Sequence, residues 1–579
     1  PRSSWADYDT KLISKGGGVF SRQEKRIKIT SEMHSVLGIS TDIAELTPNE
    51  LINAVLKAPV DLLWNGGIGT YVKSHSETHP AVGDKANDAV RVDAEQLRCR
   101  IVGEGGNLGF TQKARIEAAL NGVRINTDAI DNSAGVDTSD HEVNLKILLN
   151  LVEGLKFEER NSLLHSLTDE VAELVLQDNI VQNQVLTIAE NQAASMAQVH
   201  ERVIADWENE GRLRRDLESL PTSAVFAERI RDSKGLTRPE LSVLLAHAKL
   251  AITDELLAGT AIDQPWSENY LLSYFPQTLQ DKYRSEILSH PLRREIVATV
   301  LANRIVNHGG ITMVERAKQE TGGSCDAIAK AFVIAETCGE VPQLLAKIEA
   351  LGLARIDVQA TLLKEIRRYF DRVIRWLVTN LGDSVDVATD GNRFAQSAQV
   401  VRQELAKHLI GHERLRWEAQ SAGYQKLGVD NPLADECAGL LDTFASFDLA
   451  NMSRGSNLSL EEWSAAYFII SDELGGDLLL STISALQRND RWQTMARAAL
   501  RSDMYAVLAA VTRSVLNSSG TSVQAKIAEW RSQQAAGIAR VQELLAEISR
   551  REQPDIAAIS VALRTLRELV NQTQSQQKN

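Results

Sequence analysis

Two loops rich in glycine and asparagine contain the residue types of this chain that are best suited to chemistry. They span residues 103–109 and residues 131–139. Glycine allows a ligand to approach the backbone closely, and the side-chain amides of Asn107 and Asn132 each offer hydrogen-bond donors and an acceptor. The hydroxyl of Ser139 is suited to binding a carboxylate. These residue types predict a site for a polar small molecule.

The loops need a scaffold that brings them together. An apolar run precedes each loop, at residues 99–102 and 123–130, and we expect both runs to be β-strands. A further strand is expected at residues 59–64, leading into a third glycine-rich loop at residues 65–70. In open α/β sheets, dinucleotides and their substrates lie at the carboxyl ends of parallel strands, where such loops meet. The pattern therefore predicts a dinucleotide-binding edge.

Structural explanations compete with the functional ones for the same residues. Glycine-rich segments also form ordinary turns, and Trp64 before the third loop is also consistent with a core residue. Ser139 and Glu142 have the spacing of a helix capping box, although a helix N-terminus also attracts anions, so both roles are compatible. Between the first two loops, we expect a helix from near Thr111 to the stop signal at residues 121–122.

A short histidine-rich segment suggests a metal site. His75, Glu77 and His79 alternate in sequence, which would place them on one face of a strand. The surrounding Ser, Thr and Pro residues instead favour a surface loop, and the chain contains no HExxH motif. We therefore expect no metal site.

The whole chain of 579 residues is long enough for roughly three to five domains. Its net charge is −14, whereas nucleic-acid-binding proteins usually carry concentrated Lys and Arg, so we expect no nucleic-acid partner. The four cysteines lack CxxC spacing, which favours a reducing, cytoplasmic location. No apolar run reaches the ~18 residues of a membrane span, and we expect no membrane partner. The chain starts at Pro1 in mid-motif, from which we expect a fragment of a longer polypeptide.

Composition changes near residue 150, after which helical periodicity dominates. Pro554 separates the last two helical patterns and predicts a closing pair of antiparallel helices. The expected fold is a partial Rossmann-like α/β dinucleotide-binding domain followed by a large all-α region. The expected domains are residues 1–150, 151–340 and 341–579.

Six segments together resemble the large bacterial NAD-specific glutamate dehydrogenases. The resemblance covers essentially the whole chain and places it as the C-terminal part of a much longer polypeptide. The segments are LISKGGGVF (12–20), LWNGGIGTYV (63–72), VGEGGNLG (102–109), NTDAIDNSAGVD (126–137), RPELSVLLA (238–246) and HPLRREI (290–296).

The resemblance implies oxidative deamination of L-glutamate to 2-oxoglutarate and ammonium, with NAD as cofactor. It implies that Asn107 and Asn132 contact the nicotinamide half of NAD and that Val136 and Ser139 line the glutamate pocket, with Ser139 near a substrate carboxylate. The expected NAD-binding residues are Asn107, Asn132, Asn65, Gly105 and Gly106.

The family's catalytic Lys and Asp are expected before Pro1, so we expect this chain to contain no catalytic residue and to be inactive alone. We also expect a homo-oligomer. Two alternatives remain open: a helical scaffold or assembly module without activity, and a related dehydrogenase for a hydrophobic amino acid. NAD binding would separate the first alternative from our prediction, and turnover of glutamate against leucine and phenylalanine would separate the second.

Overall fold

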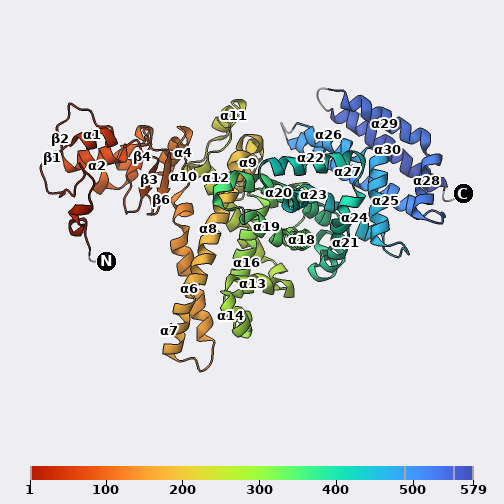
Figure 1. Cartoon of the computed structure of the whole chain (residues 1–579), viewed down its shortest axis with the longest axis horizontal. Helices are drawn as coiled ribbons and strands as arrows, with labels where there is room; N and C mark the ends of the chain where they lie inside the picture. Colours follow the sequence, from red (N-terminus) through yellow and green to blue (C-terminus); the bar gives the residue numbers. More distant parts are fainter. Residues whose placement is uncertain (1–2, 488–490, 552–554, 577–579) are drawn as a thin grey trace. The chain divides into compact units, whose positions relative to one another are not determined.

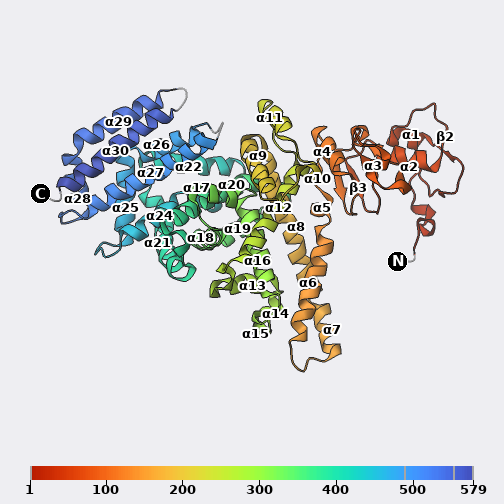
Figure 2. The same cartoon turned by 180° about the vertical axis from the view of Figure 1, so that it is seen from behind.

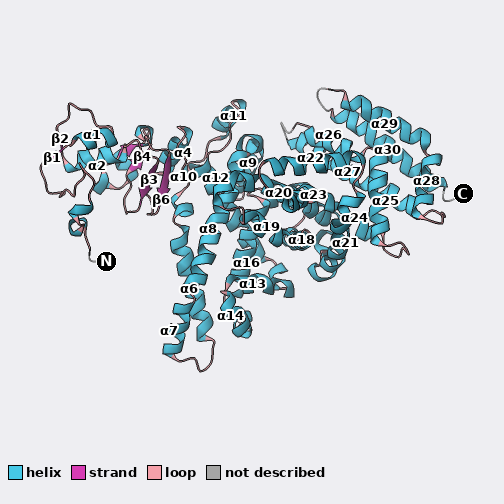
Figure 3. Cartoon of the chain, viewed as in Figure 1, coloured by secondary structure: helices cyan, strands magenta, loops and turns pink. Residues whose placement is uncertain are grey.

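A computed structural model describes residues 3–487, 491–551 and 555–576. The chain divides into two compact units. Unit 1 comprises Pro1–Ala251 with Tyr270–Ile296, and unit 2 comprises Ile252–Asn269 with Val297–Asn579. Helices dominate, and the few short strands all lie in the N-terminal part of unit 1 (Figure 3). The prediction of a largely helical chain with strands near its start is confirmed.

The described strands are short and form three two-stranded pairs. Two pairs are parallel, and isolated bridges from Val72 to Phe110 and from Ile101 to Arg124 extend them. The parallel pairs are β3 (Leu62–Asn65) with β6 (Ile101–Glu104) and β4 (Val72–Lys73) with β5 (Val92–Asp93), and the antiparallel pair is β1 (Ile27–Lys28) with β2 (Glu45–Leu46).

The strands expected at residues 59–64 and 99–102 are present, each shifted a few residues toward the C-terminus as β3 and β6. The prediction of a strand at residues 123–130 is wrong. Only Arg124 makes a β-bridge there, and the short helix α5 (Asp128–Asp131) begins within the run. Thr127 precedes this helix, and threonine and aspartate favour helix starts, which overrides the apolar pattern.

The helix predicted after Thr111 is present as α4 (Gln112–Leu120), and it packs against the parallel strands. Thr111 caps it by accepting a hydrogen bond from the backbone N–H of Ala114 at 3.1 Å. Ala114 and Ala118, four residues apart on one helix face, are fully buried against Val72 and Val102. The small side chains let the helix lie close to the strands and hold the loop between β6 and α4 in place.

Long helices follow in unit 1. Helices α6 (Ser133–Asn150) and α8 (Thr168–Asn191) run side by side, joined by α7 (Phe157–Ser166), as both views show (Figures 1 and 2). Helix α12 begins at Arg238 and ends at Ala258. No helix among the described residues has both the length and the apolar character needed to cross a bilayer.

The secondary-structure elements described in unit 2 are all helices. In α20 (Ile356–Leu381), the predicted apolar stripe is buried. The C-terminal helices α29 (Ala535–Ser549) and α30 (Ile556–Gln576) pack together as predicted, and Pro554 lies outside the described residues. Helix α30 also packs on α27 (Arg491–Leu516). The members of the α20 stripe are Leu362, Ile366, Phe370, Val373 and Leu377.

Candidate functional site

The structure brings the two asparagine-bearing loops together in unit 1. The amide nitrogen of Asn132 donates a hydrogen bond of 2.6 Å to the side-chain oxygen of Asn107. Asn107 is exposed and Asn132 is half-buried, so a ligand can reach this pair from solvent. One hydrogen bond thus joins loops that lie 25 residues apart in sequence.

A buried ion pair fixes the loop that contains Asn107. The Glu104 carboxylate is fully buried and accepts hydrogen bonds from Arg115 at 2.7 and 2.9 Å. It also accepts a bond of 3.1 Å from the backbone N–H of Phe110, at the far end of the loop. Arg115 makes a second ion pair with Asp128 at 3.1 Å, and Asp128 accepts a 2.8 Å bond from the backbone N–H of Leu108. Charge-assisted bonds of this kind hold a loop in one shape.

A second set of contacts fixes the loop that contains Asn132. The Asp131 carboxylate accepts hydrogen bonds from the backbone N–H of Glu104 at 2.9 Å and from the Asn126 amide at 2.6 Å. Asn179 on α8 donates a bond of 2.8 Å to the carbonyl of Ile130. Because Glu104 contributes to both sets, the two loops are positioned as one structure.

The third loop lies against the first. The backbone N–H of Gly106 donates to the carbonyl of Asn65 at 3.0 Å, and a Cβ added to Gly106 would lie 2.4 Å from the carbonyl oxygen of Gly67. Only glycine permits this approach. The side-chain nitrogen of Asn65 is buried against Gly109 and has no hydrogen-bond partner in the described chain.

Trp64 is not a core residue, and that interpretation of the sequence is wrong. Its side chain is 61% exposed and lies over the loop glycines. A Cβ added to Gly105 would lie 2.5 Å from the indole ring, and one added to Gly103 would lie 2.7 Å from it. The glycines make room for the ring, because Trp64 points to the solvent side of β3.

Val136 and Ser139 lie in α6, three residues apart, and both are exposed. The predicted capping role of Ser139 is wrong, because α6 begins at Ser133 and places Ser139 inside the helix. Asn132 occupies the N-cap position instead. The helical turn of α5 leads directly into α6, and therefore the helix begins before the Ser-x-x-Glu pattern.

The sequence analysis did not identify a group of three charged residues beside α6, namely Asp137, Asp178 and Lys249. Burial and the nearby Asp178 raise the pKa of Asp137 to about 6, and burial lowers the pKa of Lys249 to about 8. Asp178 lies on α8 and Lys249 on α12. Because these three residues are far apart in sequence, no local spacing could have indicated them.

The histidine-rich segment does not converge on one point. His79 contacts Arg91, whereas Glu77 accepts hydrogen bonds from the backbone N–H of Ser74 and from the hydroxyl of Thr111. His75 turns instead toward Glu117, which raises the pKa of the imidazole through a hydrogen bond. The predicted surface loop is confirmed for His75, which is exposed.

The three loops together offer hydrogen-bonding amides beside exposed apolar side chains. Ile68 is 93% exposed, and Leu108, at 64%, adopts a left-handed φ of 59°. Such a backbone is uncommon outside glycine and is a frequent feature of ligand sites. A flat ligand that bears an amide group suits this combination of Asn107, Asn132 and apolar surface.

Comparisons with known proteins identify relatives along the whole chain. Residues 1–189 match the family "Bacterial NAD-glutamate dehydrogenase, catalytic domain" and residues 233–568 match "Glutamate dehydrogenase, C-terminal". The chain is 41% identical over 98% of its length to an NAD-specific glutamate dehydrogenase of Mycobacterium tuberculosis and 41% identical over 99% to one of Pseudomonas aeruginosa. It spans 36% of the length of each of these relatives.

Proposed function

The chain belongs to the bacterial NAD-specific glutamate dehydrogenases, and from this we propose that it takes part in the NAD-dependent oxidative deamination of L-glutamate to 2-oxoglutarate and ammonium. In this proposal it supplies part of the cofactor and substrate site and acts in the cytoplasm as a homo-oligomer. Residues 1–150 belong to a Rossmann-like catalytic domain, and residues 151–340 and 341–579 form helical regions.

The hydrogen bond from Asn132 to Asn107 is the observation that carries the proposal. It leaves the amino group of Asn107 and the carbonyl oxygen of Asn132 available to a carboxamide, which needs one donor and one acceptor. The nicotinamide ring of NAD carries such a group. The exposed backbone at Gly105 and the half-buried backbone at Gly106 extend the same surface, and Asn65, which is also half-buried, adjoins them in this proposal.

Val136 and Ser139 form the substrate side of this proposal. Ser139 donates its hydroxyl proton to a glutamate carboxylate, and Val136 packs against the aliphatic part of the substrate. NAD, when bound, accepts the hydride. The residues of this chain orient the two reactants, and correct orientation is itself a large contribution to rate.

The test measures NADH binding to the 579-residue chain by fluorescence titration, with Asn132→Leu against the wild type. We expect the substitution to weaken binding about two- to tenfold, because a typical hydrogen bond contributes roughly 0.5–1.5 kcal/mol. Asn161→Leu, on the exposed surface of α7, is the matched control. Equal affinities for all three proteins would refute the proposed role of the Asn107–Asn132 pair.

A further inference from the structure

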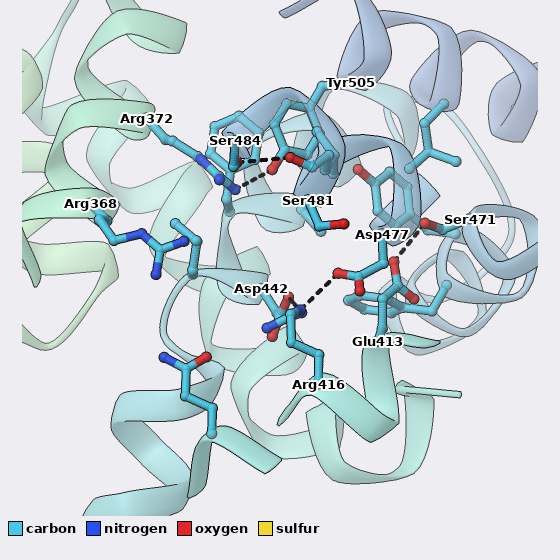
Figure 4. Close-up of a pocket in the computed structure, with 18 residues that line it drawn as sticks. Arg368, Arg372, Glu413, Arg416, Asp442, Ser471, Asp477, Ser481, Ser484 and Tyr505 are labelled. Atoms are coloured by element: carbon cyan, nitrogen blue, oxygen red, sulfur yellow. Dashed lines mark hydrogen bonds and ion pairs between the residues drawn. The ribbon is translucent and has the colours of Figure 1, made fainter. Parts of the chain in front are cut away.

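Two neighbouring cavities in unit 2 share Arg372, Phe444 and Tyr505 in their walls. The first cavity has a volume of about 200 Å³, and Figure 4 shows its polar lining. Two of its three arginines are paired: Arg416 with Asp442 at 2.5 Å and with Asp477 at 2.7 Å, and Arg368 with Glu365 at 2.9 Å. The third, Arg372, also lines the second cavity.

The second cavity has a volume of about 370 Å³ and lies between α20, α24 (Ala445–Met452) and α27. Its lining carries more positive than negative charge. Four arginines and two aspartates line it, but among the residues that the structure describes only one of each kind has an ion-pair partner. Arg375 pairs with Glu320 at 3.3 Å, and Asp503 pairs with Arg567 at 2.5 Å. The remaining lining charges are Arg372, Arg501, Arg513 and Asp448.

The three remaining arginines have no carboxylate at ion-pair distance in the part of the chain that the structure describes. Arg372 donates a hydrogen bond only to the hydroxyl of Tyr505. The Nε atom of Arg501 is buried without a hydrogen-bond partner. Burial lowers the pKa of Arg501 to about 10, and the nearby positive charges of Arg372 and Arg375 add to this effect.

Asp448 does not neutralise this excess. One carboxylate oxygen accepts a bond of 2.9 Å from the indole N–H of Trp376, and the other is buried without a partner. Burial raises the pKa of Asp448 to about 7, so it carries only part of a negative charge near neutral pH. The cavity thus holds unpaired positive charge beside the aromatic side chains of Trp376, Phe444 and Tyr505.

We propose that this cavity binds a small dianion bearing phosphate or carboxylate groups, through Arg372, Arg501 and Arg513. Planar guanidinium groups match the oxygens of both kinds of anion. The volume is at the lower end of the roughly 300–1,000 Å³ that is typical of small-molecule sites. An apolar portion of the ligand would pack on Trp376. The site lies in unit 2, whereas the loops that hold Asn107 and Asn132 lie in unit 1.

Calorimetric titration of the 579-residue chain at pH 7.5 tests the proposal, with inorganic phosphate in one arm and succinate in the other at constant ionic strength. We expect saturable binding of at least one dianion, and the arm that binds identifies the preferred group. Arg501→Gln is expected to weaken that binding at least tenfold. It should not destabilise the fold, because it removes a repelled cation, and urea unfolding checks this.

Arg564→Gln is the matched control, because it removes an exposed arginine of unit 2 that pairs only with Glu568 on the same helix. It is expected to bind like the wild type. The proposal is overturned if neither dianion binds saturably, or if Arg501→Gln binds as tightly as Arg564→Gln.

Discussion

Asn132 donates its amide proton to the side-chain oxygen of Asn107 at 2.6 Å. The bond joins the end of α5 to the loop after β6, so the two amide planes are held in a fixed relationship. Each amide keeps one unused hydrogen-bonding group on the exposed side. A preorganised pair of this kind binds a ligand amide without first losing side-chain freedom.

Ser139→Ala should impair glutamate turnover more than cofactor use. In an active enzyme that contains this chain, we expect kcat/KM for L-glutamate to fall roughly 10–100-fold, because a hydrogen bond to a charged group contributes about 1.5–3 kcal/mol. The KM for NAD should stay unchanged. Thr138→Ala is the control, since the Thr138 hydroxyl already donates to the carbonyl of Ala134 within α6. Steady-state kinetics, followed by the absorbance of NADH at 340 nm, measure these constants. An unaltered kcat/KM for glutamate would exclude Ser139 from the pocket.

Two glycine-to-alanine substitutions should have opposite effects on stability. Gly106→Ala forces a methyl group against the carbonyl oxygen of Gly67, and we expect a loss of about 1–3 kcal/mol. Gly135 lies in the first turn of α6 with nothing within 4 Å of an added Cβ. Gly135→Ala should therefore raise the free energy of unfolding by up to about 1 kcal/mol. Urea unfolding measures both, and a shared sign would contradict the close approach of the loops.

The buried ion pair of Glu104 should dominate the stability of the first loop. Arg115→Met leaves the Glu104 carboxylate buried without its partner, and we expect a cost of about 3–5 kcal/mol. The control is Arg100→Met, because the Arg100–Asp61 pair is more than four-fifths exposed on both sides. Exposed pairs contribute about 0–1 kcal/mol. Chemical denaturation measures the free energy of unfolding of both variants. Equal losses in the two variants would contradict a dominant role of the Glu104–Arg115 pair.

Glu413 should make the stability of unit 2 depend on pH. Burial raises its pKa to about 8, and Asp442 and Asp477 add to the effect. The folded chain then holds this proton at pH values where the unfolded chain releases it, so the free energy of unfolding falls as pH rises from about 4.5 to 8. The loss is at most roughly 5 kcal/mol.

Glu413→Gln lacks this titration and should become progressively more stable than the wild type between pH 5 and pH 8, with no further change above. Glu418→Gln, an exposed carboxyl on the same helix α22 (Gly411–Lys426), is the control. Urea unfolding across this pH range gives the difference directly. A constant difference between Glu413→Gln and wild type would show that Glu413 is ionised throughout.

The local sequence was sufficient for the elements that local chemistry decides. Thr111 and the glycine at position 122 marked both ends of α4, and the 3.6-residue period found the buried stripe of α20. The convergence of the two asparagine loops was also expected, although one of the two strands behind that expectation, at residues 123–130, does not form. These features depend on capping, periodicity and chain direction, which a single sequence contains.

The remaining features depend on contacts that a single sequence does not contain. The run at residues 123–130 is apolar enough for a strand, but Asp131 is drawn into hydrogen bonds with Asn126 and Glu104, and α5 forms instead. The start of α6 at Ser133 depends on α5 leading into it. Tertiary partners decide such boundaries, and the charged group of Asp137, Asp178 and Lys249 is likewise assembled from three separate helices.

The position of Trp64 gives these loops a built-in optical reporter. Its indole lies over Gly103 and Gly105 while most of the ring faces water. Any molecule that settles on the glycines changes the polarity around the ring, and the emission wavelength shifts accordingly. Comparison of wild type with Trp64→Phe would isolate that signal from the other eight tryptophans.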